Sequence, residues 1–290
     1  MQSIPDWLKV KVNVNKVGKL NNLFNLHGIE TICWNADCPN ICECYENRTA
    51  TFLLMGNICS RNCAFCGVYK GTPRPLDYNE INRIKKAIYN LDISYVVLTT
   101  VTRDDLPDGG AYYLRDIIIA LNDEKHLVEA LIPDFKGDTS LLDQIISASP
   151  AVLGHNLETV RKLYPIVRPL ANYDRSLKVL KYIKEKKSNI LTKSSLLLGL
   201  GESNVDIDKV ICDLASVSLD ILIVCQYLRP SKKQLEVREY VTLDTFELIK
   251  EKAINAGIKY VVSKPLARTS YKAFEIYKKL KGGDYHEIER

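Results

Sequence analysis

The sequence predicts an α/β fold, a partial (β/α)6 TIM-like barrel with N- and C-terminal extensions. From about Thr51 onward, short apolar runs alternate with amphipathic segments at a spacing of roughly thirty residues, the length of one βα unit. Polar and glycine-rich clusters follow several of these runs, as on the active face of a barrel enzyme. An open doubly wound sheet also fits the alternation, but the chain has no GxGxxG or Walker loop to support it.

Six apolar runs have the length and composition of buried parallel strands. They lie at 51–55, 95–101, 127–132, 151–154, 194–200 and 221–228. Helical patterns lie between them, for example from Asn79 to Leu91 and from Arg175 to Lys187, each with apolar residues on one face. Strands that alternate with helices predict a parallel sheet covered by helices.

Two segments fall outside this repeat and divide the chain into three regions. We expect an N-terminal extension over 1–50, the barrel over 51–228 and a C-terminal extension over 229–290. The first extension holds four cysteines, and the last holds a helical pattern followed by the strand-like run KYVVSKPL. Both extensions could cover one end of the barrel.

Composition and charge narrow the functional classes. With 46% apolar residues in 290, the chain can bury a full core. The 40 lysines and arginines exceed the 35 acidic residues only mildly, which favours a solvated surface over a nucleic-acid site. The first twenty residues lack a signal-peptide pattern, and no later run has the length of a membrane span. These features predict a cytoplasmic protein that binds neither nucleic acid nor membranes.

The nine cysteines indicate metal binding, because an odd number without an export signal argues against a disulfide framework. Cys59, Cys63 and Cys66 form a C-x3-C-x2-C motif directly after the first predicted strand. Three thiolates can hold three corners of a cubane cluster and leave one iron open to a small molecule. A zinc loop is the alternative, although zinc sites usually show paired C-x2-C units. Cys212 and Cys225, in apolar surroundings, are expected in the core.

The motif, with Phe65 before its last cysteine, resembles the signature of the radical S-adenosylmethionine (radical SAM) superfamily. A second triplet, Cys33, Cys38 and Cys44, has the spacing C-x4-C-x5-C. The two triplets together resemble one family, lipoyl synthase. The likeness runs from Ile32 to Ala273 and includes the stretches LTTVTRDDLPDGGA, EALIPDFKGD, GHNLETVRKLYPIVRP, TKSSLLLGLGE and QYLRPS.

The resemblance implies that the second triplet holds an auxiliary cluster, completed by Ser270 in LARTSYKA. From the residues alone, that serine would be read as a turn hydroxyl, since serine is a poor iron ligand. Cys42 stands where the family usually has glycine and is either a spare thiol or an alternative ligand. The departures at Thr102, Lys264 and Thr269 remove no predicted ligand.

Analogy with related radical enzymes suggests which residues bind S-adenosylmethionine. Asn156 and Glu158 would bond the ribose hydroxyls, and Arg175 would bond the methionyl carboxylate. An arginine fork matches the two oxygens of a carboxylate. The alternative is a helix N-cap at Asn156 with surface charges beside it.

The resemblance also implies the activity and the partners. Two 4Fe–4S clusters would act with S-adenosylmethionine, whose cleavage gives a 5'-deoxyadenosyl radical that removes hydrogen from an unactivated carbon. The substrate would be an octanoyl group on a lysine of a lipoyl carrier protein, either a lipoyl domain or the glycine-cleavage carrier protein. The auxiliary cluster would donate two sulfur atoms and be consumed. The reductant would be a low-potential donor such as ferredoxin or flavodoxin.

Two other functions fit part of the pattern. A different sulfur-inserting radical enzyme, such as a methylthiotransferase or a biotin synthase relative, would lack the N-terminal triplet joined to RTSY. An electron carrier with two clusters would need neither a barrel nor an open iron. The pairing of both triplets therefore favours the lipoyl reading.

Overall fold

A parallel sheet of seven strands forms the centre of the computed structural model, which describes residues 4–9, 18, 21–22, 24–36, 38–46, 49–93 and 95–282. The strands pair in chain order, and every neighbouring pair is parallel. In the described part of the chain β1 and β9 are the two edges, so the barrel is partial. The strands are β1 Thr51–Leu54, β4 Tyr95–Thr100, β5 Leu127–Leu131, β6 Val152–Gly154, β7 Leu191–Leu198, β8 Ile221–Gln226 and β9 Tyr260–Ser263.

All six predicted strands are present, and the sheet gains a seventh. β9 comes from the strand-like run near the C-terminus and pairs with β8 from Ile221↔Tyr260 to Val224↔Ser263. β7 begins at Leu191, earlier than expected, because its polar residues are buried with partners. Lys193 Nζ lies 2.7 Å from Glu129 Oε1, and the Thr192 hydroxyl donates to Asp220. Because these polar residues are buried with hydrogen-bond partners, a search for apolar runs does not detect this part of the strand.

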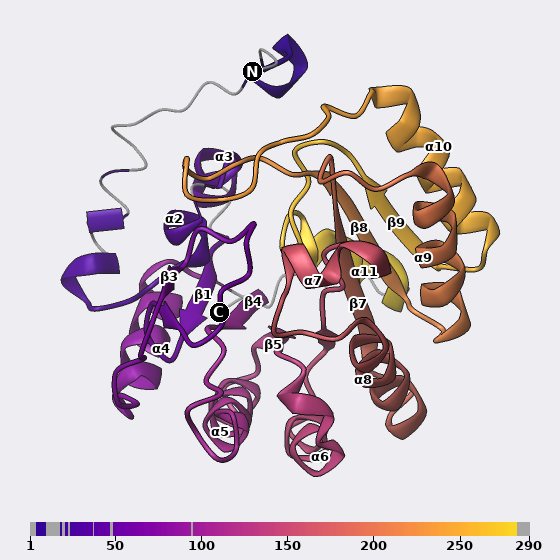
Figure 1. Cartoon of the computed structure of the whole chain (residues 1–290). Coiled ribbons are helices and arrows are strands. Elements are labelled where there is room, and N and C mark those ends of the chain that lie inside the picture. Colours follow the sequence, from indigo (N-terminus) through magenta and orange to yellow (C-terminus); the bar gives the residue numbers. More distant parts are fainter. Residues whose placement is uncertain are drawn as a thin grey trace.

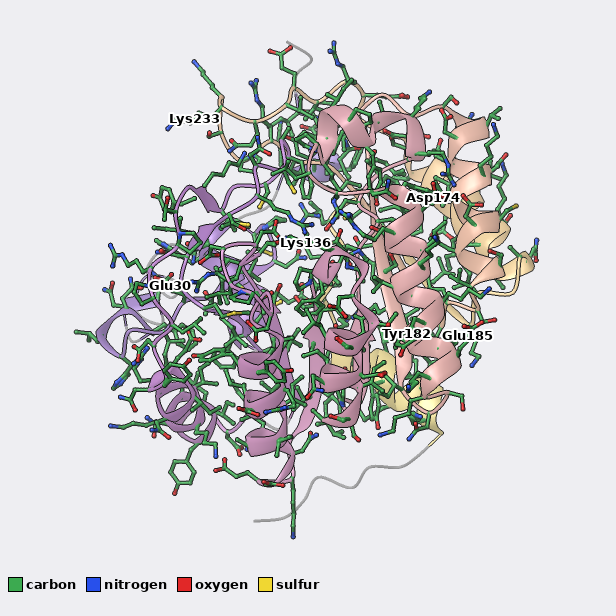
Figure 2. The ribbon with its side chains drawn as sticks, turned by 60° about the horizontal axis from the view of Figure 1, so that its bottom comes forward. Glu30, Lys136, Asp174, Tyr182, Glu185 and Lys233 are labelled. Atoms are coloured by element: carbon green, nitrogen blue, oxygen red, sulfur yellow. The ribbon has the colours of Figure 1, made fainter. Side chains whose placement is uncertain are left out.

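Helices form an outer arc around the strands (Figure 1). The larger ones are α4 Glu80–Asn90, α5 Ala111–Asn122, α6 Thr139–Ser147, α8 Tyr173–Lys186, α9 Asn204–Ser216 and α10 Leu243–Asn255. Side-chain caps set several starts: Asn172 caps α8, Thr242 caps α10, and Ser203 forms a capping box with Asp206 at α9. Polar residues of α8 such as Asp174 and Glu185 project from its outer side (Figure 2). Within the described ranges, every helix falls short of what a membrane span requires.

Shorter elements connect the barrel to its extensions. They are η1 Asp6–Leu8, α2 Ile32–Asn35, α3 Ile41–Glu46, β2 Ile58–Cys59, β3 Tyr69–Lys70, η2 Phe135–Gly137, η3 Arg161–Leu163, α7 Tyr164–Val167 and α11 Ala273–Lys281. α2 packs against β1. The side chain of Asn40 donates to the Leu266 carbonyl at 2.6 Å, so the N-terminal and C-terminal segments contact each other.

The two cysteines outside the triplets have different environments. Cys225, in β8, is buried as predicted. The prediction that Cys212 is a core residue is wrong, because Cys212 is exposed on α9. The buried face of that helix is formed by Ile207, Val210, Ile211 and Leu214, and Cys212 lies one position beyond it.

Candidate active site

A cavity of about 400 Å³ lies inside the curve of the sheet. Alternate residues of several strands reach it, for example Val97 and Thr99 of β4 and Ser195 and Leu197 of β7. This period of two is what a strand produces when one face looks inward. The rest of the wall comes from loops that follow the strands, which is where barrel folds place their chemistry.

The first cysteine triplet lies in the loops after β1, and all three of its residues line the cavity. Cys59 Sγ accepts the backbone N–H groups of Arg61 at 3.4 Å and Thr102 at 3.3 Å. The loop itself is fastened at Ala64, whose N–H donates to the Val167 carbonyl at 2.9 Å and whose carbonyl accepts from Leu235. The barrel therefore holds this triplet through backbone hydrogen bonds.

Burial controls the protonation of these thiols. It raises the pKa of Cys66 to about 12. It also raises the pKa of Cys63, against the opposing effect of the Arg168 guanidinium. Both thiols are therefore protonated at neutral pH when no metal is bound. Iron that binds them must displace those protons, as metal ions do at thiolate sites.

The second triplet is carried by the two short N-terminal helices. Cys33 lies in α2, Cys44 lies in α3, and Cys38 lies between them. Cys33 and Cys38 line the cavity, and the charges of both act on Cys44. Burial raises the pKa of Cys33 to about 11 and that of Cys44 to about 12. The structure therefore gathers this triplet next to the first.

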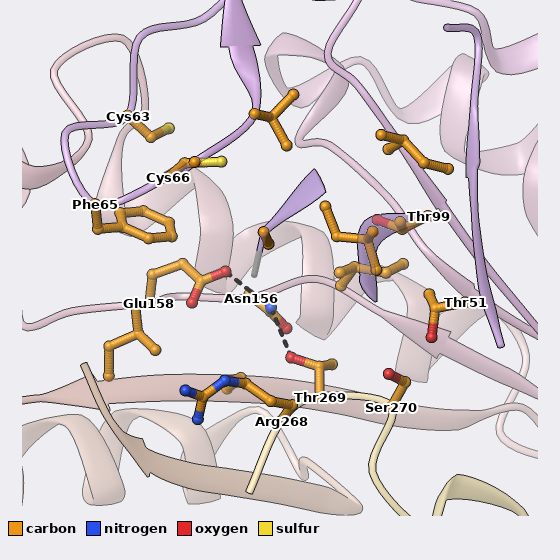
Figure 3. Close-up of a pocket in the computed structure, with 18 of the residues that line it drawn as sticks. Thr51, Cys63, Phe65, Cys66, Thr99, Asn156, Glu158, Arg268, Thr269 and Ser270 are labelled. Atoms are coloured by element: carbon orange, nitrogen blue, oxygen red, sulfur yellow. Dashed lines mark hydrogen bonds between the residues drawn. The ribbon is translucent and has the colours of Figure 1, made fainter. Parts of the chain in front are cut away.

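Ser270 also lines the cavity, in a C-terminal segment that is fixed on both sides (Figure 3). On one side, the Thr269 hydroxyl accepts a hydrogen bond from Asn156 Nδ2 at 3.1 Å. On the other side, the Tyr271 hydroxyl donates to Glu43 Oε1 at 2.9 Å. Because Glu43 lies in α3 with Cys44, this segment brings the predicted serine ligand to the N-terminal triplet.

The cysteine sets fit iron clusters better than single ions. All nine cysteines lie within the described residues, and none of them forms a disulfide. In that part of the chain, no three histidine, cysteine, aspartate or glutamate side chains are placed to hold one metal ion. A cubane cluster spreads its ligands over four irons, so its thiolates lie further apart than the ligands of one ion. The three thiols of each set supply the donor atoms that such a cluster takes from a protein.

Asn156 and Glu158 follow β6 and both line the cavity. Asn156 Nδ2 donates to Glu158 Oε1 at 2.8 Å, while its Oδ1 is buried and has no partner among the described residues. Glu158 has a positive φ of 66° and is held to β7 by two backbone hydrogen bonds. Asn156 does not cap a helix, because the next helical turn begins at Arg161 with Val160 as its N-cap. An unpaired buried acceptor suits a ligand hydroxyl.

Arg175 is placed differently from the other predicted residues. It lies in α8 and donates through Nε to Asp134 Oδ2 at 2.7 Å. Asp134 also accepts from Arg61 at 2.7 Å. Burial raises the pKa of Asp134, but the two arginines outweigh it and hold that pKa well below its usual range. Among the described residues that line the cavity, Arg175 is missing.

Sequence reasoning missed the arginines of the cavity wall, among which are Arg168 and Arg268. Arg168 Nη1 donates to the carbonyls of Asn156 at 2.6 Å and Leu157 at 3.1 Å. Arg268 Nη1 donates to the Ala267 carbonyl at 2.6 Å. Most arginines are exposed, so a single arginine carries no sign of burial in the sequence. The only available signal was their position inside the stretches VRP and RTSY.

Comparison with known proteins identifies similar sequences over nearly the whole chain. The model of the radical SAM superfamily matches residues 53–214. A lipoyl synthase of Caldicellulosiruptor bescii is 46% identical over 272 residues, which cover 93% of this chain and 94% of that one. A lipoyl synthase of Aquifex aeolicus is 46% identical over 270 residues, covering 92% and 98% respectively.

Solved structures share the fold at much lower identity. Methylornithine synthase matches with a TM-score of 0.54 and 15% identity, covering 73% of this chain and 71% of that one. Streptococcus suis SuiB bound to its precursor peptide matches with a TM-score of 0.59 and 12% identity, covering 95% and 60%. At these identities the likeness concerns the fold alone, and it confirms the predicted α/β partial barrel.

Proposed function

Because this chain belongs to the lipoyl synthase family of the radical SAM superfamily, we propose that it inserts two sulfur atoms into an octanoyl group on a lysine of a carrier protein. Membership of this family implies S-adenosylmethionine and two 4Fe–4S clusters as cofactors. The observation that carries the proposal is a single cavity lined by cysteines of both triplets, by Ser270 and by the pair Asn156 and Glu158.

Each residue set has a proposed role. Cys59, Cys63 and Cys66 hold the cluster that binds S-adenosylmethionine. The other cluster is held by Ser270 and by the N-terminal triplet, Cys33, Cys38 and Cys44. Asn156 and Glu158 bind the ribose, and the unpaired Asn156 Oδ1 supports this role. Arg175 stays a prediction for the methionyl carboxylate, and its contact with Asp134 gives it no support.

The cofactors, when bound, supply a 5'-deoxyadenosyl radical that removes hydrogen from an unactivated carbon and the sulfide sulfur that replaces it. The residues of this chain position the substrate and exclude water. Val97, Leu131 and Leu197 give the cavity apolar wall against which an acyl chain can lie. The segment around Ser270 covers the same space, which protects a reactive centre from solvent.

Each of the three regions of the chain has a proposed role in the reaction. Residues 1–50 supply the auxiliary cysteines, residues 51–228 form the radical site, and residues 229–290 supply Ser270. The octanoylated carrier is a lipoyl domain or the glycine-cleavage carrier protein, and a ferredoxin or flavodoxin type donor provides electrons. We further propose that the reaction takes place in the cytoplasm.

The test is anaerobic reconstitution of the full chain, followed by incubation with S-adenosylmethionine, a reductant and an octanoyl-lysine peptide. Two four-iron clusters predict about eight irons per chain and a peptide that gains two sulfur atoms. The variant Cys212→Ser, which changes an exposed cysteine outside both triplets, is the control and should behave as the parent. Only one cluster, or 5'-deoxyadenosine without sulfur in the peptide, would contradict the proposal.

A further inference from the structure

Arg168 is a buried cation that is held in one position beside the first triplet. It follows α7 and is 9% exposed. Its Nη1 donates to two carbonyls, those of Asn156 and Leu157, and lies 3.2 Å from the Tyr164 hydroxyl. Its backbone N–H donates to the Tyr164 carbonyl at 2.8 Å. These bonds hold the guanidinium in place through Nη1.

Arg168 lies next to the cysteine loop. Val167, the residue before Arg168, accepts the Ala64 N–H at 2.9 Å, so the two loops are joined next to Cys63. Arg168 and Cys63 both line the cavity, so the guanidinium lies on the same wall as the first triplet. Its Nε is buried and has no partner among the described residues.

The groups around Arg168 leave it as a cation opposed by one anion. Glu158 lines the same cavity, and its carboxylate interacts electrostatically with Arg168. Burial raises the pKa of Glu158, and the Arg168 guanidinium opposes that effect. Burial and the charge of Arg168 lower the pKa of His155 to about 4, so that ring is neutral at pH 7. Burial raises the pKa of Tyr164, which is therefore neutral as well.

We propose that Arg168 is a positioning residue whose fixed positive charge makes one-electron reduction of the cluster held by Cys59, Cys63 and Cys66 more favourable. The electron comes from the low-potential donor, and no bond in the protein forms or breaks. Reduction adds a negative charge to the cluster, and a nearby cation in a buried site stabilises that charge. An arginine keeps its own charge at every accessible pH. The inference rests on the proposed function, because it takes these three cysteines as cluster ligands.

If Arg168 acts through its charge, replacing Arg168 and replacing Glu158 should shift the reduction potential of the cluster in opposite directions. A purely structural role would not produce opposite shifts. The experiment is a potentiometric titration of the reconstituted full chain, followed by the electron paramagnetic resonance signal of the reduced cluster. In Arg168→Met, we expect the equilibrium constant for reduction to fall at least tenfold, which is about 59 mV toward negative potential. Arg168→Lys keeps the positive charge, so its reduction potential should differ less from that of the parent protein. Glu158→Gln should shift the potential toward positive values.

The matched control is Arg161→Met, seven residues earlier. Arg161 has a side chain that is 54% exposed and pairs with Asp174 on the surface, so its loss should leave the potential unchanged. An unchanged potential in Arg168→Met with its cluster intact would overturn the proposal, as would shifts of the same sign in Arg168→Met and Glu158→Gln. If Arg168→Met binds no cluster, a zero or negative shift in Glu158→Gln overturns it. A parent protein that shows these potentials but inserts no sulfur would contradict the proposed function alone.

Discussion

Both cysteine triplets contribute residues to the wall of one cavity, but they are supported in different ways. The Cys59, Cys63 and Cys66 triplet lies in loops that the barrel holds by backbone hydrogen bonds, including those of Ala64 to Val167 and Leu235. Cys33 and Cys44 lie on two short helices outside the sheet, and Cys38 lies between those helices. The chain before α2 is bonded to β1, where the Leu53 N–H donates to the Glu30 carbonyl at 2.9 Å. Side-chain hydrogen bonds of Asn40 and Glu43 also join this region to the C-terminal segment. The second triplet therefore depends on contacts between the two ends of the chain, which the first triplet does not need.

The largest expected effect is that substitutions in the two triplets act differently on S-adenosylmethionine cleavage and on sulfur insertion. Cys63→Ala should abolish both S-adenosylmethionine cleavage and sulfur insertion, because it removes one of the three thiolates assigned to the cluster that binds S-adenosylmethionine. Cys38→Ala should abolish sulfur insertion while cleavage continues. Each variant should lose about half of the iron, roughly four atoms per chain. Chromatography of 5'-deoxyadenosine and mass spectrometry of the peptide measure the two reactions. Equal loss of both reactions in Cys38→Ala would break the distinction between the triplets.

Ser270 should affect only the auxiliary side. Ser270→Ala removes the hydroxyl that we assign as the fourth ligand, so sulfur insertion should fall sharply or stop while S-adenosylmethionine cleavage is retained. Ser188→Ala, which deletes an exposed hydroxyl outside the cavity wall, is the control and should insert sulfur normally. Full activity of Ser270→Ala would reject the ligand role.

His155 should affect the stability of the barrel. Its ring is buried, with Nδ1 2.9 Å from the Ile132 carbonyl and Nε2 3.0 Å from the Ser176 hydroxyl, and its pKa falls from 6.5 to about 4. Between these values the unfolded chain binds a proton that the folded chain does not. The free energy of unfolding therefore decreases as pH falls from about 6.5 to 4, by about 2 kcal/mol at pH 5 from this group.

Urea denaturation at pH 7 and pH 5 measures that loss. The variant His155→Asn has no titrating ring, so the parent should lose about 2 kcal/mol more than the variant between the two pH values. Carboxylates contribute to both proteins and cancel in the difference. Equal losses would show that the ring is accessible to protons in the folded protein.

The smallest effect concerns the bond between Tyr271 and Glu43. Tyr271→Phe removes one partly exposed hydrogen bond, worth about 0.5–1.5 kcal/mol, so sulfur insertion should slow by roughly twofold to tenfold. S-adenosylmethionine cleavage should not change, because the barrel holds that triplet separately. Tyr89→Phe, at an exposed position of α4, is the matched control. A slower cleavage step in Tyr271→Phe would show that the two supports are not independent.

The sequence predicted most of what periodicity and spacing encode. Six strands and both triplets follow from local patterns, because apolar runs and cysteine intervals are read over a few residues. The membership of β9 in the sheet depends on its pairing with β8, across the intervening helix α10. The start of β7 was missed because Lys193 is buried only through its partner Glu129, 64 residues away. Such partners are set by tertiary structure.

The positions of the arginines at the site also depend on tertiary partners and could not be predicted from local sequence patterns. Arg175 was expected at the ligand because of its position downstream of Asn156, but Asp134 binds its guanidinium. Arg168, which contacts the Asn156 carbonyl, was marked in the sequence only by its place in the stretch VRP. Which arginine faces the cavity is decided by the carbonyls and carboxylates that the fold brings near each one.

The hydrogen bond between Asn40 and Leu266 joins residues 226 positions apart, and that separation has a consequence for protein synthesis. The chain leaves the ribosome N-terminus first, and closing so long a loop must wait for its second end. The cysteines at 33, 38 and 44 are among the first to emerge, yet their serine partner is among the last. The loops with Cys59, Cys63 and Cys66 are held by residues no later in the chain than Leu235. During translation, the partners of the first triplet therefore emerge before those of the second, and the sulfur-donating site waits for almost the entire polypeptide.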